Sequence, residues 1–417
     1  MNFVKHYRCT LCDATYPPTE INTCSECGEK GILDIEYDYE AMKTMIHKPY
    51  FDSNHQYDMW RYAPMMSVET QHLYKSLRVG WTPLYEAQMT HKTLGLKKVY
   101  IKDEGVNPTG SLKDRASAVA VIKAITYGYD TISCSSTGNA ASSLAGNAAR
   151  MGLKTVIFVP KRAPSGKLRQ LMMYGARVIS VDGDYRDTYN LSKAAIDEFN
   201  WYNRNAAINP HLVEGKKTVA LEIAEQLQFQ PTDWVVVSVG DGCTIAGVYK
   251  GFYDLKMLGL IAKIPKLLGV QSAGCDPFVQ AAKASRDLEE VEENTIADSI
   301  AVGLPRNPVK GLAAVKKSQG QWINVSDEHI LASMKTLGKT EGIFGEPAGV
   351  TAYAGLEKAV KEGIITASET ATIIVTGNGL KDPENAEKVT GKPVRLKPDL
   401  EALKKYLKQQ ESEDKDE

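Results

Sequence analysis

Residues 99–136 read VYIKDEGVNPTGSLKDRASAVAVIKAITYGYDTISCSS: a short β-branched run, a turn, a long apolar stretch that ends in glycine, and a second β-branched run. The pattern continues through NAASSLAGNAARMG (139–152), TVIFVP (155–160), SGKLRQLMMYG (165–175) and ARVISVD (176–182). Gly128, Gly152 and Gly175 stand where helix C-caps are expected. Strands that alternate with helices predict a parallel sheet covered by helices.

The second half of the chain repeats this organisation. Its strand candidates are WVVVSVG (234–240), LLGVQSA (267–273) and TIIVTGNG (372–379), with helical stretches between them. We therefore predict an α/β fold with two open, twisted, mostly parallel sheets flanked by helices. Ligands in such folds bind at the carboxyl ends of the strands. The segments SSTGN (135–139), VGDGC (239–243) and VTGNG (375–379) each follow a strand, so we expect them to converge on one crevice.

Composition narrows the class of protein. The 417 residues are 43% hydrophobic and 24% charged, which is typical of a globular protein with more than one core. A formal net charge of −1 predicts no general attraction to nucleic acid or to an anionic membrane. The N-terminal stretch MNFVKHYRCT lacks the apolar run of a signal peptide, and no segment has the ~20 apolar residues of a membrane helix. We expect a cytoplasmic protein.

Four of the seven cysteines lie in two CxxC pairs, CTLC and CSEC, which contain Cys9, Cys12, Cys24 and Cys27. Two such pairs can complete a closed tetrahedral zinc site, whose role would be structural because so short a segment buries little apolar surface. Four thiols without metal are the alternative. A nucleic-acid-binding ribbon is a third interpretation, but DATYPPTEIN (13–22), between the pairs, contains no Lys or Arg.

Lys113 is the first candidate for chemistry. Asn107 and Pro108 predict a turn, and Ser111 with Asp114 predicts a capping-box-like helix start that places Lys113 in the first helical turn. The following residues are mostly apolar, so the helix should be buried. Burial and the helix dipole both favour the neutral amine, which can form a Schiff base with an aldehyde. An ordinary solvated lysine is the alternative.

Pyridoxal phosphate is an aldehyde that also needs a phosphate cradle, a donor to its ring hydroxyl and a partner for its pyridine nitrogen. Gly240 and Gly242 follow a strand and precede a helix, which favours a phosphate cradle, and their spacing is not the GxGxxG of a dinucleotide site. Asn139 and Thr376 stand at strand ends where they can meet the ring. Each of these motifs taken alone is typical of a glycine turn.

The chain resembles the fold type II pyridoxal-phosphate enzymes, which are tryptophan synthase β-like, and within them the threonine synthases with a cysteine-rich N-terminal segment. The matching motifs are EGVNPTGSLKDR (104–115), SSTGNAASSLAGNAAR (135–150), EGKKT (214–218), VYKGF (248–252), EPAG (346–349) and VTGNGLKD (375–382). The resemblance implies that Lys113 forms the Schiff base and that Thr376 bonds the pyridine nitrogen. It implies a cofactor phosphate held by Gly240, Asp241, Gly242, Cys243 and Thr244, a ring hydroxyl bound by Asn139, and a substrate carboxylate bound by Ser136, Thr137, Asn139 and Ala140.

The same resemblance implies a division of the chain and a reaction. The expected parts are a zinc-ribbon-like segment (1–36), a large cofactor-binding domain (37–115 and 215–400), a small mobile domain (116–214) and a charged C-terminal tail (401–417). The reaction would convert O-phospho-L-homoserine and water to L-threonine and phosphate. The resemblance also implies a homodimer, and we expect no nucleic-acid or membrane partner.

Two departures from the family pattern bear on the substrate. The loop expected to hold the cofactor's phosphate contains Asp241, whose carboxylate is tolerable there only if the side chain points away. Leu212 stands where the family commonly has an Arg that holds the substrate's phosphate. His211 beside it is interpreted as a packed or solvated histidine. The candidates to replace the missing Arg are Lys161, Arg162, Lys167, Arg169 and Arg306.

Two other functions stay open at this point. One keeps the cofactor but catalyses α,β-elimination or β-replacement on threonine, serine or O-phosphoserine, as a dehydratase, an ammonia-lyase or a cysteate or cysteine synthase does, and Leu212 favours it. The other is a zinc-ribbon protein that binds a regulatory ligand without catalysis, against which Lys113 and Thr376 argue.

Overall fold

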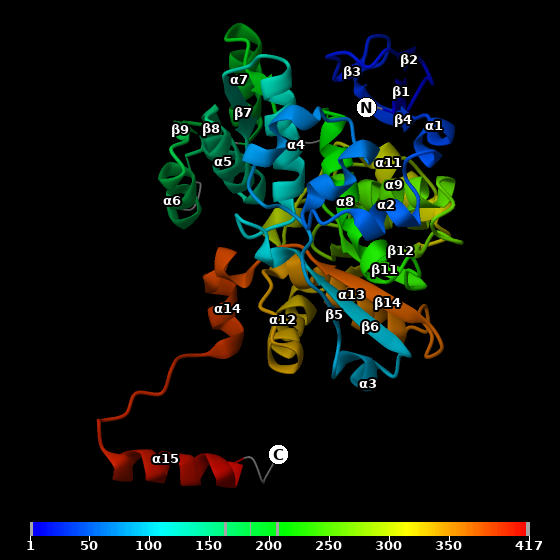
Figure 1. The fold of residues 1–417 in the computed structure, drawn as a ribbon. Coiled ribbons are helices and arrows are strands. Elements are labelled where there is room, and N and C mark those ends of the chain that lie inside the picture. Colours follow the sequence, from blue (N-terminus) through cyan, green and yellow to red (C-terminus); the bar gives the residue numbers. More distant parts are fainter. Residues whose placement is uncertain (1–2, 162–164, 184, 206–207, 414–417) are drawn as a thin grey trace.

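The computed structural model describes residues 3–413 except 162–164, 184 and 206–207. It contains three sheets, each with its own set of strands (Figure 1). The α/β fold with two mostly parallel sheets, predicted from the alternation of strands and helices, is confirmed.

The small sheet has the order β10-β7-β8-β9 and is parallel throughout. Ser133 pairs with Val156, and Ser135 at the end of β7 pairs with Phe158. Helices α4 and α5 pack on this sheet together with α7, and α6 packs on β9. The elements are β7 (Thr131–Ser135), β8 (Lys154–Pro160), β9 (Arg177–Val181), β10 (Tyr202–Asn203), α4 (Lys113–Thr126), α5 (Asn139–Met151), α6 (Ser165–Met173) and α7 (Tyr185–Glu198).

The large sheet has the order β13-β12-β11-β14-β6-β5, in which only the β5–β6 pair is antiparallel. Its strands are β5 (Leu84–Glu86), β6 (Lys98–Asp103), β11 (Trp234–Ser238), β12 (Lys266–Ser272), β13 (Gln321–Val325) and β14 (Thr370–Val375). Helix α13 packs across four of these strands, α9 packs on β11 and β12, and α11 packs on β12 and β13. The helices of this part are α3 (Thr90–Leu94), α8 (His211–Gln226), α9 (Cys243–Met257), α10 (Pro277–Ala284), α11 (Pro308–Lys317), α12 (Asp327–Glu341), α13 (Pro347–Lys361) and α14 (Pro383–Thr390).

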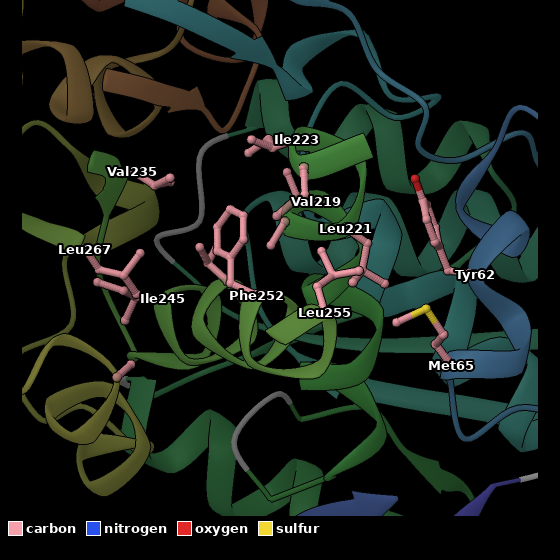
Figure 2. Packing of buried hydrophobic residues seen from close by; sticks show 14 of the residues in the cluster. Tyr62, Met65, Val219, Leu221, Ile223, Val235, Ile245, Phe252, Leu255 and Leu267 are labelled. Carbon is pink, nitrogen blue, oxygen red and sulfur yellow. The ribbon is translucent and has the colours of Figure 1, made fainter. Parts of the chain in front are cut away.

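Apolar side chains of α8 and α9 form the core under the large sheet. Figure 2 shows Phe252 of α9 among Val219, Ile245 and Leu267, with Tyr62 at the edge of the cluster. All five are buried. Because α8 also packs against α4, this core holds α4 between the two sheets.

The N-terminal sheet is antiparallel, with the order β2-β1-β4-β3. Its strands are β1 (Val4–Cys9), β2 (Thr15–Tyr16), β3 (Thr23–Cys24) and β4 (Gly28–Tyr37). Lys250 of α9 and Lys310 of α11 donate hydrogen bonds to the carbonyls of Ile35 (2.7 Å) and Leu33 (2.6 Å). The sheet is therefore attached to α9 and α11 through these two lysines.

Short helices complete the chain: α1 (Tyr39–Lys43), α2 (Lys48–Ser53), η1 (Met59–Met65), η2 (Thr70–Lys75), η3 (Glu104–Val106), η4 (Asp298–Ile300) and η5 (Gly379–Lys381). The last helix, α15 (Leu400–Glu413), lies apart from the body at the end of an extended segment (Figure 1). Among the described residues, the helices are too short or too polar to cross a membrane. The domain boundaries after residues 115 and 214, near the starts of α4 and α8, stay predictions.

Candidate active site

A cavity of about 480 Å³ lies where strands of both sheets end. The loops after β7, β11 and β14 line it, together with the start of α4. The expectation that these three strand ends converge on one crevice is therefore confirmed. Of the predicted site residues, the lining contains Lys113, Ser136, Thr137, Asn139, Ala140, Gly240, Asp241, Gly242, Cys243, Thr244 and Thr376.

Lys113 begins α4 and stands in the cavity wall. The preceding loop is fastened to the end of β14, because Leu112 donates its N–H to the carbonyl of Thr376 (2.9 Å) and Asn378 donates to that of Gly110 (3.0 Å). Burial, together with the positive charges of Lys216 and Arg204, lowers the pKa of Lys113 to about 8, although Asp241 opposes this effect. A substantial fraction of this amine is neutral near physiological pH, as nucleophilic and proton-transfer chemistry requires.

The predicted capping box at the start of α4 is wrong. Leu112 is the N-cap residue, without a side-chain cap, and Ser111 Oγ accepts only a long hydrogen bond from the Lys113 N–H (3.3 Å). The Asp114 carboxylate turns back to Thr109 instead, where it accepts from the backbone N–H (2.8 Å) and the hydroxyl (2.9 Å). Asp114 therefore shapes the turn before Lys113 rather than capping the helix.

The loop from Gly240 to Thr244 leads from β11 into α9, which starts at Cys243. Gly242 has a φ of +86°, and a Cβ on it would lie 2.7 Å from the carbonyl oxygen of Asn307, so only glycine suits this position. No side chain caps α9. First-turn N–H groups of a helix lack partners within it and bind anions. The Asp241 carboxylate accepts from the backbone N–H of Arg306 (3.3 Å), on the adjoining loop.

The loop after β7 brings Ser136, Thr137 and Asn139 to the start of α5. Asn139 is buried, and its Nδ2 donates to Glu346 Oε1 (2.6 Å) and to Ser299 Oγ (3.2 Å). Glu346 is itself buried and lines the cavity at the start of α13. The sequence interpretation gave no role to Glu346, although the EPAG motif that contains it was among the matching segments.

Thr376 follows β14 and stands half-buried in the cavity wall. Its carbonyl anchors the loop before Lys113, as described above. Its hydroxyl makes no hydrogen bond within the part of the chain that the structure describes. The hydroxyl is therefore available to a ligand that offers a donor or an acceptor.

Leu212 and His211 both point into packed regions. Leu212 is fully buried in the apolar cluster of the small sheet. His211 Nδ1 lies 2.7 Å from Ser67 Oγ, its ring meets the edge of Tyr7, and burial lowers its pKa well below the ordinary value. The interpretation of His211 as a packed histidine agrees with these contacts.

Of the five basic residues suggested as replacements for the missing Arg, Arg306 lines the cavity. Lys161 pairs with Asp182 at the surface (2.9 Å), and Arg169 is exposed away from the cavity lining. Arg162 lies outside the described residues, as does the side chain of Lys167.

The cavity holds two further buried cations that the sequence analysis missed, Arg204 and Lys216, and the exposed Arg186 also lines it. Arg204 and Lys216 are each only 2% exposed. Lys216 stands in the EGKKT motif, so its place in a matching segment was a usable signal. No signal in the sequence marked Arg204, which follows the two-residue strand β10.

The sulfur atoms of Cys9, Cys12, Cys24 and Cys27 all lie within 4.8 Å of one another. Gly31 packs against them, since a Cβ there would lie 2.5 Å from Cys24 Cβ. Such a cluster of four thiols suits a closed tetrahedral metal site. Among the described residues, this is the one group of three or more potential ligands that the geometry gathers.

Residues 75–377 match the family described as pyridoxal-phosphate dependent enzyme. The threonine synthase of Methanocaldococcus jannaschii is 40% identical over 96% of this chain and 99% of its own. The threonine synthase of Methanosarcina acetivorans is 38% identical over 96% of this chain and 98% of its own.

Solved structures with the same fold are more distant in sequence. The processed form of threonine deaminase isoform 2 from Solanum lycopersicum is similar with a TM-score of 0.64 at 21% identity, over 76% of this chain and 89% of its own. Diaminopropionate ammonia lyase from Escherichia coli has a TM-score of 0.65 at 20% identity, over 74% of this chain and 87% of its own. These likenesses concern the fold alone.

Proposed function

The chain belongs to the threonine synthases, within the family of pyridoxal-phosphate-dependent enzymes, and we propose that its cavity converts O-phosphohomoserine and water to threonine and phosphate. The chain is thus a lyase that acts on a small amino-acid substrate. The observation that carries the proposal is the meeting of Lys113, the glycine loop and Thr376 in one cavity. Assembly as a homodimer and a cytoplasmic location stay predictions.

The residues of the cavity fit pyridoxal phosphate. Residues 240–244 offer an uncapped helix start for its phosphate, and a Cβ at Gly242 would clash with Asn307 and Phe278 and so distort this loop. Lys113 offers an amine with a pKa of about 8 for its aldehyde. Asn139 and Thr376 offer an amide and a hydroxyl for the ring. A hydroxyl at Thr376, unlike a carboxylate, does not favour a protonated pyridine nitrogen.

Bound at these residues, pyridoxal phosphate withdraws electrons from the carbon atoms of the substrate. The chain supplies the proton transfers and the orientation. Lys113, which would hold the cofactor's aldehyde, is suited to take and return protons at the α and β carbons because of its lowered pKa. The start of α5, with Ser136 and Thr137, is suited to the substrate's carboxylate. In the overall reaction phosphate leaves the γ carbon and water adds at the β carbon.

The test is to supply the purified, cofactor-loaded protein with O-phosphohomoserine and to measure phosphate and threonine. We expect the two products in equal amounts. A second candidate substrate is serine, which carries no phosphate and which the buried Leu212 favours because that position cannot hold one. Formation of pyruvate and ammonia from serine, with no threonine from O-phosphohomoserine, would overturn the proposed reaction and leave the cofactor assignment standing.

We also propose that the four N-terminal cysteines hold one zinc ion. The purified chain is expected to contain about one zinc per chain, and Cys24→Ser to lose it, because a thiolate ligand is removed from a closed site. Elemental analysis measures the content, and thermal unfolding should show a lower midpoint for Cys24→Ser, since metal binding contributes to folding.

Cys275→Ser is the matched control, because Cys275 is buried outside the cluster. It should keep the metal. A wild-type chain that is folded and free of zinc after purification in zinc-containing medium would contradict the proposal.

A further inference from the structure

Two buried cations line the cavity but are not among the residues proposed to bind the cofactor or the substrate's carboxylate. Lys216, on α8, is 2% exposed, and its ammonium has no hydrogen bond or ion pair with any described residue. Arg204 is equally buried, and its guanidinium donates only to Ser117 Oγ among the described residues, through Nε (3.3 Å) and Nη2 (3.1 Å). Both side chains line the cavity.

Two uncharged polar groups beside them also lack partners. Asn205 Nδ2 and Ser135 Oγ are buried and make no hydrogen bond in the described structure. Asn205 follows Arg204 directly, and its Oδ1 accepts the backbone N–H of Ser135 (3.3 Å), so the two side chains adjoin. Both line the same cavity. Most buried polar groups in proteins are paired, and unpaired ones point to a missing ligand or water.

The charges indicate what that ligand is. Burial lowers the pKa of Lys216, and the neighbouring Arg204 lowers it further, although Cys243 and Asp241 oppose this effect. Burial likewise lowers the pKa of Arg204. A buried cation without a counter-ion is unfavourable, and two near each other are more so. A dianion with several acceptor oxygens would compensate both charges and satisfy both orphan groups.

The position of Lys216 on α8 also indicates that the cavity holds an anion. Leu212, where an Arg was expected, packs into the apolar cluster of the small sheet. Lys216 follows one turn later on the same helix and reaches the cavity. The cofactor's phosphate already has the start of α9 as its proposed partner, so a second phosphate group is the ligand left to be held.

We propose that Lys216, Arg204, Asn205 and Ser135 form a second phosphate-binding pocket, which holds the phosphate that leaves the substrate. The inference rests on the proposed function, and it narrows the substrates to phosphorylated amino acids. It also explains how the site works without an arginine at position 212.

The experiment uses the cofactor-loaded protein and inorganic phosphate, the product, as the probe. Calorimetric titration with phosphate is expected to show binding to the wild type and a loss of affinity of about tenfold to a hundredfold in Lys216→Gln and Arg204→Gln, because each removes a hydrogen-bonded charge. The KM for O-phosphohomoserine should rise by a similar factor. The ratio of cofactor absorbance to protein should stay at the wild-type level.

Lys123→Gln is the matched control, because Lys123 is also buried but lies outside the cavity lining. It should bind phosphate as the wild type does. The thermal midpoint of Lys216→Gln, measured without phosphate, is expected to rise, since the variant removes an unpaired buried charge. This readout also establishes that the variant folds.

Other outcomes would overturn the inference. Unchanged phosphate affinity in both variants would overturn it. Loss of the cofactor from the variants, with unchanged phosphate affinity of the protein that stays loaded, would also overturn it. That second result would assign the two cations to the cofactor's own phosphate. Failure of the proposed function looks different: the wild type binds phosphate and loses that binding in the variants, yet forms no threonine. Then the pocket stands and the substrate is another phosphorylated amino acid.

Discussion

Lys113→Ala is expected to lower the rate of threonine formation by at least about 10²–10⁴-fold, the range that a positioned proton carrier contributes. The variant should also lose the visible absorbance of the lysine-bound cofactor, because it removes the amine at the start of α4 that would hold the cofactor's aldehyde. The physical reason is the combination found at this residue: a place in the cavity wall and a pKa lowered to about 8 by burial. The rate is measured with the cofactor in excess.

Lys123→Ala is the control for this experiment. Lys123 lies ten residues further along α4, is buried, and has its pKa lowered by burial, but stands outside the cavity lining. Its replacement should leave the absorbance in place and the rate within a few fold of the wild type. A Lys113→Ala variant that forms threonine at a tenth of the wild-type rate or more would remove Lys113 from its assigned role.

Arg115→Met is expected to lower the free energy of unfolding by about 3–5 kcal/mol, because it leaves buried carboxylates without their counter-ion. The Arg115 guanidinium donates to Glu104 through Nε (2.7 Å) and to Glu222 through Nη1 (2.5 Å), and all three side chains are fully buried. Lys102 also donates to Glu222 (2.8 Å). This cluster joins α4 to β6 and α8.

Denaturant unfolding measures the effect, and Arg177→Met is the matched control because Arg177 is exposed on β9. A surface change of this kind usually alters stability by less than ~0.5 kcal/mol. A loss below about 1 kcal/mol for Arg115→Met would contradict the assignment of the cluster to stability. If activity per folded protein then fell sharply, Arg115 would act on the position of Lys113 instead.

Local patterns predicted the elements that carry the site. The β-branched run at 99–102 became β6, and the apolar stretch after Lys113 became α4. Gly152 is the left-handed C-cap of α5, as its place after the apolar run indicated. These features depend on backbone conformation and on burial of one face, which neighbouring residues specify by themselves.

The glycine loops could also be located from the sequence, because each follows a strand and the ends of parallel strands meet at one edge. Residues 135–139, residues 239–243 and Thr376 do line one cavity. The predicted capping box does not form, although Ser111 and Asp114 have the right spacing for one. The Asp114 carboxylate accepts a hydrogen bond from Thr109 instead. Spacing alone does not decide between two competing hydrogen bonds.

Tertiary structure alone decided which charged side chains face the cavity. Leu212 and Lys216 lie on one helix, yet Leu212 packs against the small sheet and Lys216 reaches the cavity, because α8 lies between α4 and α9. The Arg204 side chain reaches the cavity from the residue after β10, the edge strand of the small sheet. Glu346 reaches it from the start of α13.

The sequence by itself therefore determined the alternation of elements, the cysteine cluster and the lysine at the start of α4, since these follow from periodicity, spacing and local backbone requirements. The packing of the two sheets decided the counter-charges, the orphan donors and the anion that the cavity can hold. Those depend on contacts between residues far apart in the chain, and no local pattern specifies the distance between such side chains.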